Sequence, residues 1–287
     1  MKCAFIAARK AEHTVTILCR CLEVARSGFY AWCRRPESRR AREDRRLKVL
    51  VRASFDESHR RYGSPRIHAD LIDRQEPVSR KRVIRLMRED GLVARARRRA
   101  QGTTMSDHDH PVAANLLDRA FTAEGPNQRG VGDTTELRIG EHGKLYLAAI
   151  LDLFSRFIVG WAVSAAHDRH LTIQALDMAL KRRAPAVGVL HHSDRGCTYA
   201  SEDYQTVLDA RGMVCSMSRR GNGYDNAVME SFFSTVKSEL GAHFDNHGHA
   251  TRALFDYIEA FYNQRRRHST LGQISPAAFE RRAAQAA

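Results

Sequence analysis

Apolar residues recur at helical spacing through residues 64–92, and capping residues divide that stretch into two short helices. Ser64 is expected to cap the first helix, and Ser79 the second, which Gly91 closes. A polar break around Pro77 separates them. The apolar positions are Ile67, Leu71, Val83, Leu86 and Met87. Two helices joined by a tight turn have the form of a helix-turn-helix.

The second of these helices is strongly basic. Its cations are Arg80, Lys81, Arg82, Arg85 and Arg88. The first four are expected to contact DNA, because a helix-turn-helix places its second helix in the major groove. The alternative is an ordinary helical hairpin with a solvated basic face. Residues 15–32 have the same rhythm of helix, turn and helix, and could form a second such unit.

After residue 120 the pattern changes to short β-rich runs that alternate with amphipathic helices. Three leading strands followed by helix-strand alternation predict an α/β core, with a mixed sheet flanked by helices. The stretch between the two patterns is polar and contains Gly, Ser and Pro, which is typical of a linker. We therefore expect four regions: a helical one with a possible helix-turn-helix (1–45), a helix-turn-helix module (46–100), a linker (101–122) and an α/β catalytic core with C-terminal helices (123–285).

Charge adds a partner to this picture. The 287 residues carry a formal net charge of +14, and all of the excess lies in the first third. Residues 1–100 hold 27 Lys and Arg against 12 Asp and Glu, whereas residues 101–287 hold 20 against 21. An excess this concentrated and this rich in arginine indicates a polyanion, most simply nucleic acid.

Cysteine spacing and hydropathy exclude other classes of protein. The six cysteines include no C-x-x-C pair, so a zinc module is poorly supported and reduced thiols are expected. The most apolar stretch, 145–163, is interrupted by Asp152, Ser155 and Arg156, and no export signal is recognisable. We expect a cytoplasmic protein without a membrane segment.

Three carboxylates occupy positions where an α/β sheet presents functional groups. Asp133 lies in the first strand, Asp194 ends a later strand in "HHSDRG", and Glu230 lies one turn into a helix. Together they could hold two Mg²⁺ ions for an in-line phosphodiester displacement. Each acid alone is weak evidence, since aspartates at strand ends are commonly turn or capping groups. Asp152, Asp168 and Asp225 are rivals, the last two as helix N-caps.

The helix that carries Glu230 presents a mixed polar face. Asn226, Glu230 and Lys237 follow one another at i, i+4 and i+11, so they lie on the same side. We expect Asn226 and Lys237 to meet DNA beside Glu230. The roles of the neighbours of Asp194 stay open: His191 and His192 could orient Asp194 or simply pack, and Arg195 could pair with phosphate or with an acid.

With 35 residues between Asp194 and Glu230, and Asp133 upstream, the acids resemble the D, D(35)E signature of retroviral-type integrases and transposases. The long motifs "LYLAAILDLFSRFIVGWAVS", "SMSRRGNGYDNAVMESFFSTVKSEL" and "YIEAFYNQRRRHSTLGQISP", with "RYGSPRIHADL" upstream, are similar to the second-frame (OrfB) transposases of the insertion sequence three family. The resemblance runs in colinear order over residues 3–282.

This resemblance implies a ribonuclease-H-like core in which Asp133, Asp194 and Glu230 bind Mg²⁺ or Mn²⁺, two ions in all. It also implies a helix-turn-helix upstream, a DNA contact by Lys237, and cleavage and joining of the element's terminal repeats into target DNA. The expected partners are DNA, further copies of the chain and a first-frame protein, in the bacterial nucleoid. The rivals are a catalytically inactive DNA-binding regulator and a nuclease that does not join.

Three positions depart from the family pattern near Asp133. Gly130 stands where a tryptophan is usual, and Thr134 and Glu136 replace isoleucine and tyrosine. The loss of apolar bulk is expected to loosen the first strand, so that Gly130→Trp would raise stability or activity.

Overall fold

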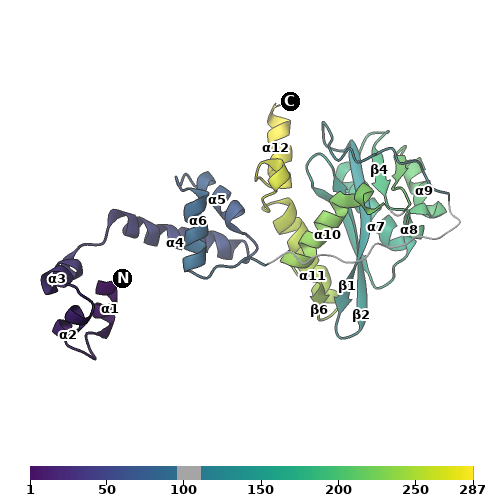
Figure 1. The fold of residues 1–287 in the computed structure, drawn as a ribbon. Helices are drawn as coiled ribbons and strands as arrows, with labels where there is room; N and C mark the ends of the chain where they lie inside the picture. Colours follow the sequence, from purple (N-terminus) through teal and green to yellow (C-terminus); the bar gives the residue numbers. More distant parts are fainter. Residues whose placement is uncertain (96–110, 221, 287) are drawn as a thin grey trace. The chain divides into compact units, whose positions relative to one another are not determined.

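The computed structural model describes residues 1–95, 111–220 and 222–286, which fall into two compact units, Met1–Val93 and Ala94–Ala287 (Figure 1). Each unit is described by itself. The first is all helical. Its helices are α1 (Lys2–Arg9), α2 (Val15–Cys21), α3 (Arg26–Arg34), α4 (Arg39–Glu57), α5 (Ser64–Asp73) and α6 (Arg80–Glu89).

The helices α5 and α6 are the two predicted between residues 64 and 92. Ser79 Oγ accepts the Arg82 N–H at 3.3 Å, which confirms the predicted cap of α6, and Gly91 follows the helix with φ of +62°. The cap of α5 was predicted wrongly: Gly63 is the N-cap, and Ser64 is already helical.

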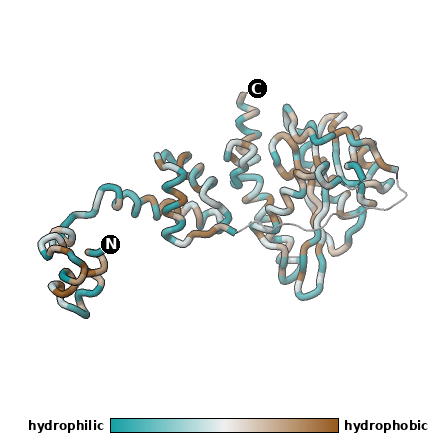
Figure 2. The backbone as a smooth tube through the Cα atoms, viewed as in Figure 1, coloured by the Kyte–Doolittle hydropathy of each residue, from teal (hydrophilic) through white to brown (hydrophobic). Residues whose placement is uncertain are grey.

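Two small apolar clusters hold the first unit together. Ile6, Leu18, Cys19 and Phe29 form the core of α1–α3. In α4 the buried residues begin only at Leu47, and the hydrophilic first half of this helix is visible in Figure 2. Its apolar second half contacts α5 and α6, whose buried residues are those predicted from the spacing.

The second unit contains the mixed sheet that the sequence predicts. Its strands are β1 (Arg129–Ile139), β2 (Gly143–Asp152), β3 (Ile158–Ser164), β4 (Leu190–Ser193), β5 (Val214–Met217) and β6 (His243–Phe244). The order is β3-β2-β1-β4-β5, with β6 also paired to β1. The first three strands are antiparallel, whereas β4 and β5 run parallel to β1. Residues 147–152 of β2 are all buried, because helices cover both faces of the sheet.

The helices of the second unit are α7 (Arg169–Arg183), α8 (Cys197–Ala200), α9 (Glu202–Ala210), α10 (Ala227–Glu239), α11 (His247–Phe255) and α12 (Pro276–Ala286). Single turns η1 (Gly223–Asn226) and η3 (Ser269–Leu271) and the π-helix η2 (Asp256–Asn263) complete it. Helix α7 packs on β2 and β3 so closely that a Cβ at Gly160 would lie 2.1 Å from the Ala175 carbonyl oxygen. On the other face, Trp161 Nε1 donates to Glu259 of η2 at 2.8 Å.

The second half of the predicted linker packs on the core. Leu117 is buried, and the backbone N–H groups of Leu116 and Leu117 donate to Ser216 Oγ at 2.9 and 3.2 Å. Residues 101–110 of that linker lie outside the described residues. Across the described ranges, no helix combines the length and apolarity needed to cross a membrane.

Candidate functional site

The sheet register brings Asp133, which lies inside β1, beside Asp194, which directly follows the end of β4. Val131 of β1 pairs with His192 of β4, and each aspartate lies two residues further along its chain. Asp133 Oδ1 accepts the Thr134 N–H at 2.7 Å, and Asp194 Oδ1 accepts the Gly196 N–H at 2.9 Å. Parallel neighbours carry their C-terminal residues to the same edge, so the two carboxylates lie side by side.

Glu230 reaches the same place from α10, which packs against β1. Asp133 pairs with Ala149, and Ala149 with Trp161, so all three side chains occupy the sheet face that contacts η2. Burial raises the pKa of Asp133 well above its ordinary value, and the negative charges of Asp194 and Glu230 raise it further. The three predicted acids are therefore within electrostatic reach of one another.

The donor set suits a hard divalent cation. Three carboxylates supply only oxygen ligands, which Mg²⁺ and Mn²⁺ prefer, and their mutual repulsion favours a positive charge between them. Over the described residues, no three His, Cys, Asp or Glu side chains are already close enough together to form a metal site. The chemistry and charge of the residues fit a metal, while a closed ligand cage is not preformed.

The two predicted DNA contacts on α10 flank Glu230. Lys237 is half-buried, and burial lowers its pKa while the charges of Glu136 and Asp133 raise it. Asn226 is 5% exposed, and among the described residues its amide oxygen and nitrogen have no hydrogen-bond partner. Glu136, which also forms an ion pair with Lys144 at 3.0 Å, brings an additional carboxylate near Lys237.

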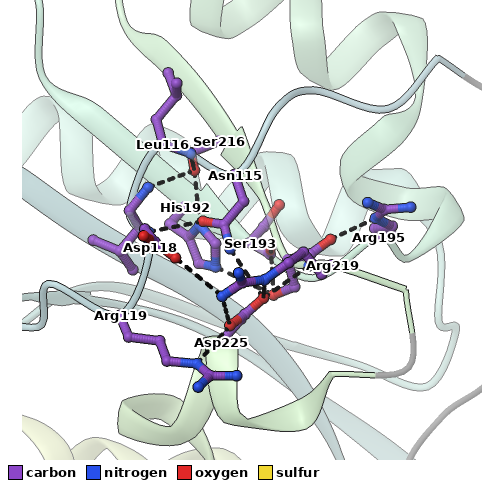
Figure 3. A network of polar contacts seen from close by, with 12 residues as sticks. Asn115, Leu116, Asp118, Arg119, His192, Ser193, Arg195, Ser216, Arg219 and Asp225 are labelled. Carbon is purple, nitrogen blue, oxygen red and sulfur yellow. Dashed lines mark hydrogen bonds and ion pairs between the residues drawn. The ribbon is translucent and has the colours of Figure 1, made fainter.

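A buried carboxylate fixes the chain just before α10 (Figure 3). Asp225 is fully buried and accepts hydrogen bonds from Arg119 Nε at 3.0 Å, Asn115 Nδ2 at 2.9 Å and Arg219 Nη2 at 2.9 Å. Hydrogen bonds from Arg219 hold the pKa of Asp225 far below its ordinary range. The predicted N-cap role of Asp225 was wrong, since Asn226 is the cap residue and Asp225 lies within η1. No spacing in the sequence signals the full network, because two of its partners, Asn115 and Arg119, lie about a hundred residues away.

The two histidines before Asp194 are packing groups. His191 Nε2 is 2.8 Å from the Tyr204 hydroxyl, and His192 lies between the hydroxyls of Ser216 and Ser218 at 2.9 and 3.2 Å. Arg195 Nε donates to the Ser218 carbonyl oxygen (Figure 3). These contacts brace β4 against β5 and so fix the strand end that carries Asp194.

Burial lowers the pKa of His191 and of His192 to about 4. A lowered histidine pKa stabilises the fold above the unfolded value of 6.5, and that stability is lost as pH falls from 6.5 to 4. Between pH 4 and 6.5, we expect His191→Phe to reduce the slope of the unfolding free energy against pH by about 1.4 kcal/mol per pH unit. This is the slope that one proton bound only in the unfolded state contributes. The raised pKa values of Asp133 and Asp152 make the fold less stable as pH rises, which opposes the effect of the histidines. The quantity to measure is therefore the difference in unfolding free energy between His191→Phe and wild type, by urea unfolding at each pH.

Leu208, which is buried and carries no titratable group, provides the control for this measurement, and Leu208→Val should change the free energy of unfolding equally at every pH. A parallel pH profile for wild type and His191→Phe would show that His191 is not held neutral.

The predicted DNA-contacting side chains of α6 divide into two pairs. Arg82 Nε donates to Asp44 Oδ1 at 2.7 Å, and Arg85 Nη2 donates to Asp44 Oδ2 at 2.7 Å. These two arginines therefore hold α6 against α4. Arg80 and Lys81 are exposed, and within the described part of the chain neither forms an ion pair.

Gly130 borders a cavity of about 40 Å³ that Ile150 and His191 also line. A Cβ at position 130 would lie 3.7 Å from Ile150 Cγ2 and 3.9 Å from His191 Nδ1, which are ordinary contacts. The space is too small for an indole, since a cavity of about 150 Å³ is filled by benzene. The residues around Gly130 therefore pack closely and leave no space for a tryptophan side chain. The cavity has room for a methyl group only.

We expect Gly130→Ala to raise the free energy of unfolding by about 1 kcal/mol, because alanine restricts the unfolded chain and adds contacts in the cavity. The matched control is Gly132→Ala, whose Cβ would lie 3.0 Å from His191 Cε1 and should destabilise the fold. Urea unfolding compares the three proteins. Equal effects of the two substitutions would contradict this account of the cavity.

Comparison with known proteins agrees with this geometry. Residues 123–223 and 211–276 match models described as integrase core domain, and residues 41–100 match an HTH-like domain. The transposase InsF for insertion sequence IS3A of Escherichia coli is 42% identical over 98% of this chain and 98% of its own length. An insertion element IS600 protein of Shigella sonnei is 42% identical over 91% of this chain and 97% of its own.

Similar solved structures are viral integrases. A simian T-cell lymphotropic virus intasome, in complex with a PP2A regulatory subunit, covers 80% of this chain and 74% of its own at 14% identity and a TM-score of 0.47. The magnesium complex of the HTLV-2 integrase catalytic core covers 55% and 98% at 16% identity and a TM-score of 0.39. On the identity and coverage of its bacterial relatives, the chain belongs to the IS3-type insertion sequence transposases, which act through a divalent-metal-dependent integrase core.

Proposed function

We propose that Asp133, Asp194 and Glu230 are the catalytic residues of this transposase and that they hold two Mg²⁺ or Mn²⁺ ions. The observation that carries the proposal is their convergence: β1, the end of β4 and α10 bring three carboxylates within electrostatic reach, so that their charges raise the pKa of Asp133. When bound, such ions stabilise the attacking and leaving oxygens of a phosphodiester displacement.

The neighbouring residues position DNA for that displacement. Lys237 supplies a positive charge close to the carboxylates of Glu136 and Asp133. A DNA phosphate that approaches Glu230 would therefore meet a cation. Asn226 offers an amide donor and acceptor with no other partner in the described residues. Asp225 and its arginines keep the start of α10 in place, which fixes Asn226 and Glu230 relative to the strand ends.

Upstream, Arg80 and Lys81 are proposed to contact the phosphates of the element's terminal repeats, while Arg82 and Arg85 maintain the fold of the module. The two remaining partners, target DNA and a first-frame protein, complete the reaction that the family resemblance implies. We also propose that several copies act together on the nucleoid, because transposition requires two ends to be held at once. The regions 1–45, 46–100 and 123–285 are proposed as its domains.

The test incubates the full chain, alone and together with its first-frame protein, with labelled duplexes that carry the terminal repeats flanking its reading frame, in Mg²⁺, Mn²⁺ or EDTA. Metal-dependent cleavage followed by joined product supports the proposal. Cleavage without joining would indicate a nuclease, and binding without either would indicate a regulator. Either of those two results would overturn the proposal.

A further inference from the structure

The helices α1–α3 form a module that lies outside the segments matched by the family models. Helices α2 and α3 meet across a short turn in which Glu23 has a φ of +53° and the Val24 N–H donates to the Cys19 carbonyl oxygen at 2.9 Å. Leu18 and Phe29 pack together with Ile6 of α1. Three small helices with a tight turn before the last have the build of a helix-turn-helix.

Helix α3 has one buried residue, Phe29, and all of its other residues are exposed. Arg26, Tyr30 and Arg34 recur at i, i+4 and i+8 and therefore line one face. Ser27 precedes Arg34 by seven residues, or two helical turns, and therefore lies beside the same face. Within the described ranges none of these four side chains has a hydrogen-bond or ion-pair partner. The face thus presents two guanidinium groups and two hydroxyls that no residue of the fold uses.

Charge favours DNA over protein as the partner of this face. Helix α3 contains no acid, and residues 1–35 hold seven Lys and Arg against two Glu. One of those acids, Glu12, is paired with Arg9 at 2.7 Å. The exposed Trp32 stacks on Phe29 with ring centroids 6.3 Å apart, so its ring lies on the side away from Arg26 and Arg34. The outward face is basic and polar rather than apolar, as in a nucleic-acid interface.

We propose that α2 and α3 form a second DNA-binding unit, in which α3 enters a major groove and Arg26 and Arg34 contact phosphate or guanine. The proposal rests on the transposase function in that its ligand is the element's DNA, and it adds a second point of contact to that of α6. An α-helix with its side chains is about 10–12 Å across, so α3 fits a major groove about 12 Å wide.

The experiment compares full-length wild type with Arg26→Ala/Arg34→Ala on a 60-base-pair duplex carrying one terminal repeat. Fluorescence anisotropy gives the affinity over a range of salt concentrations, and nuclease footprinting gives the protected segments. The double variant should bind at least about tenfold more weakly, with a slope of log affinity against log salt reduced by about 2. It should also lose one protected segment. Its melting midpoint should stay unchanged, because both arginines are solvent-exposed and unpaired in the described structure.

The matched control is Lys2→Ala/Lys10→Ala, which removes the same charge from α1 and its C-cap. Equal losses in the two double variants, or wild-type binding by Arg26→Ala/Arg34→Ala, would overturn the proposal. A change in oligomeric state without a change in DNA affinity would assign the face to a second copy and overturn it too. Wild-type protein that protects two segments but joins no DNA would instead count against the proposed catalytic function alone.

Discussion

Replacing Asp194 with asparagine is expected to reduce cleavage and joining of terminal-repeat duplexes by about a thousandfold or more, with DNA affinity unchanged within about twofold. Asparagine keeps the shape of the side chain and an oxygen that can accept the Gly196 N–H. What it removes is the negative charge beside Asp133, and with it a proposed metal ligand. Denaturing gels of the labelled strands measure both reaction steps.

The matched control for this substitution is Asp168→Asn. Asp168 caps α7 through the Leu171 N–H at 3.1 Å, and asparagine caps a helix about equally well, so activity should be retained. A second readout does not depend on activity: Mn²⁺ should raise the melting midpoint of wild type and of Asp168→Asn, but much less that of Asp194→Asn. If Asp194→Asn joined strands at the wild-type rate, Asp194 would not be a catalytic residue.

The local pattern of apolar and polar residues was sufficient to predict the strands and helices that carry the site. The apolar runs predicted the strands because both faces of the sheet are covered, and the placement of Asp133 and Asp194 follows from parallel pairing. Helical spacing likewise predicted the buried positions of α5 and α6. These features depend on neighbouring residues in the sequence or on the pairing of two strands. They can therefore be predicted from the hydrophobic periodicity and the order of the strands.

Other features depend on partners that no periodicity identifies. The predicted DNA contacts Arg82 and Arg85 pair with Asp44, about forty residues earlier, because α4 packs beside α6. The predicted linker binds Ser216 through its backbone N–H groups, which are invisible to a reading of side chains. Asp225 likewise pairs with Arg119, about a hundred residues earlier, in addition to its near neighbour Arg219. In each case the sequence shows the charged or polar group, and only the tertiary structure shows its partner.

Helix α10 is held at both ends by buried carboxylates. Asp225 fixes its start, and Glu239 fixes its last turn by accepting from Arg266 Nη2 at 2.7 Å, Arg266 Nε at 2.9 Å and the Tyr257 hydroxyl at 2.9 Å. Glu239, Arg266 and Tyr257 are 6%, 4% and 1% exposed. Since Glu230 and Lys237 lie between these two anchors, the geometry of the site depends on them.

Removing the second anchor is expected to produce a large loss of stability. Glu239→Ala leaves the Arg266 guanidinium buried without its carboxylate, and breaking a buried ion pair on one side costs about 3–5 kcal/mol. Urea unfolding measures it through Trp161 fluorescence in a Trp32→Phe background, which reports the second unit alone. The control is Asp203→Ala, whose bridge to Arg169 is exposed and should contribute less than about 1 kcal/mol. Similar losses of stability in the two variants would mean that Glu239 does not anchor α10. The position of Glu230 would then be fixed by the contacts of Asp225 alone.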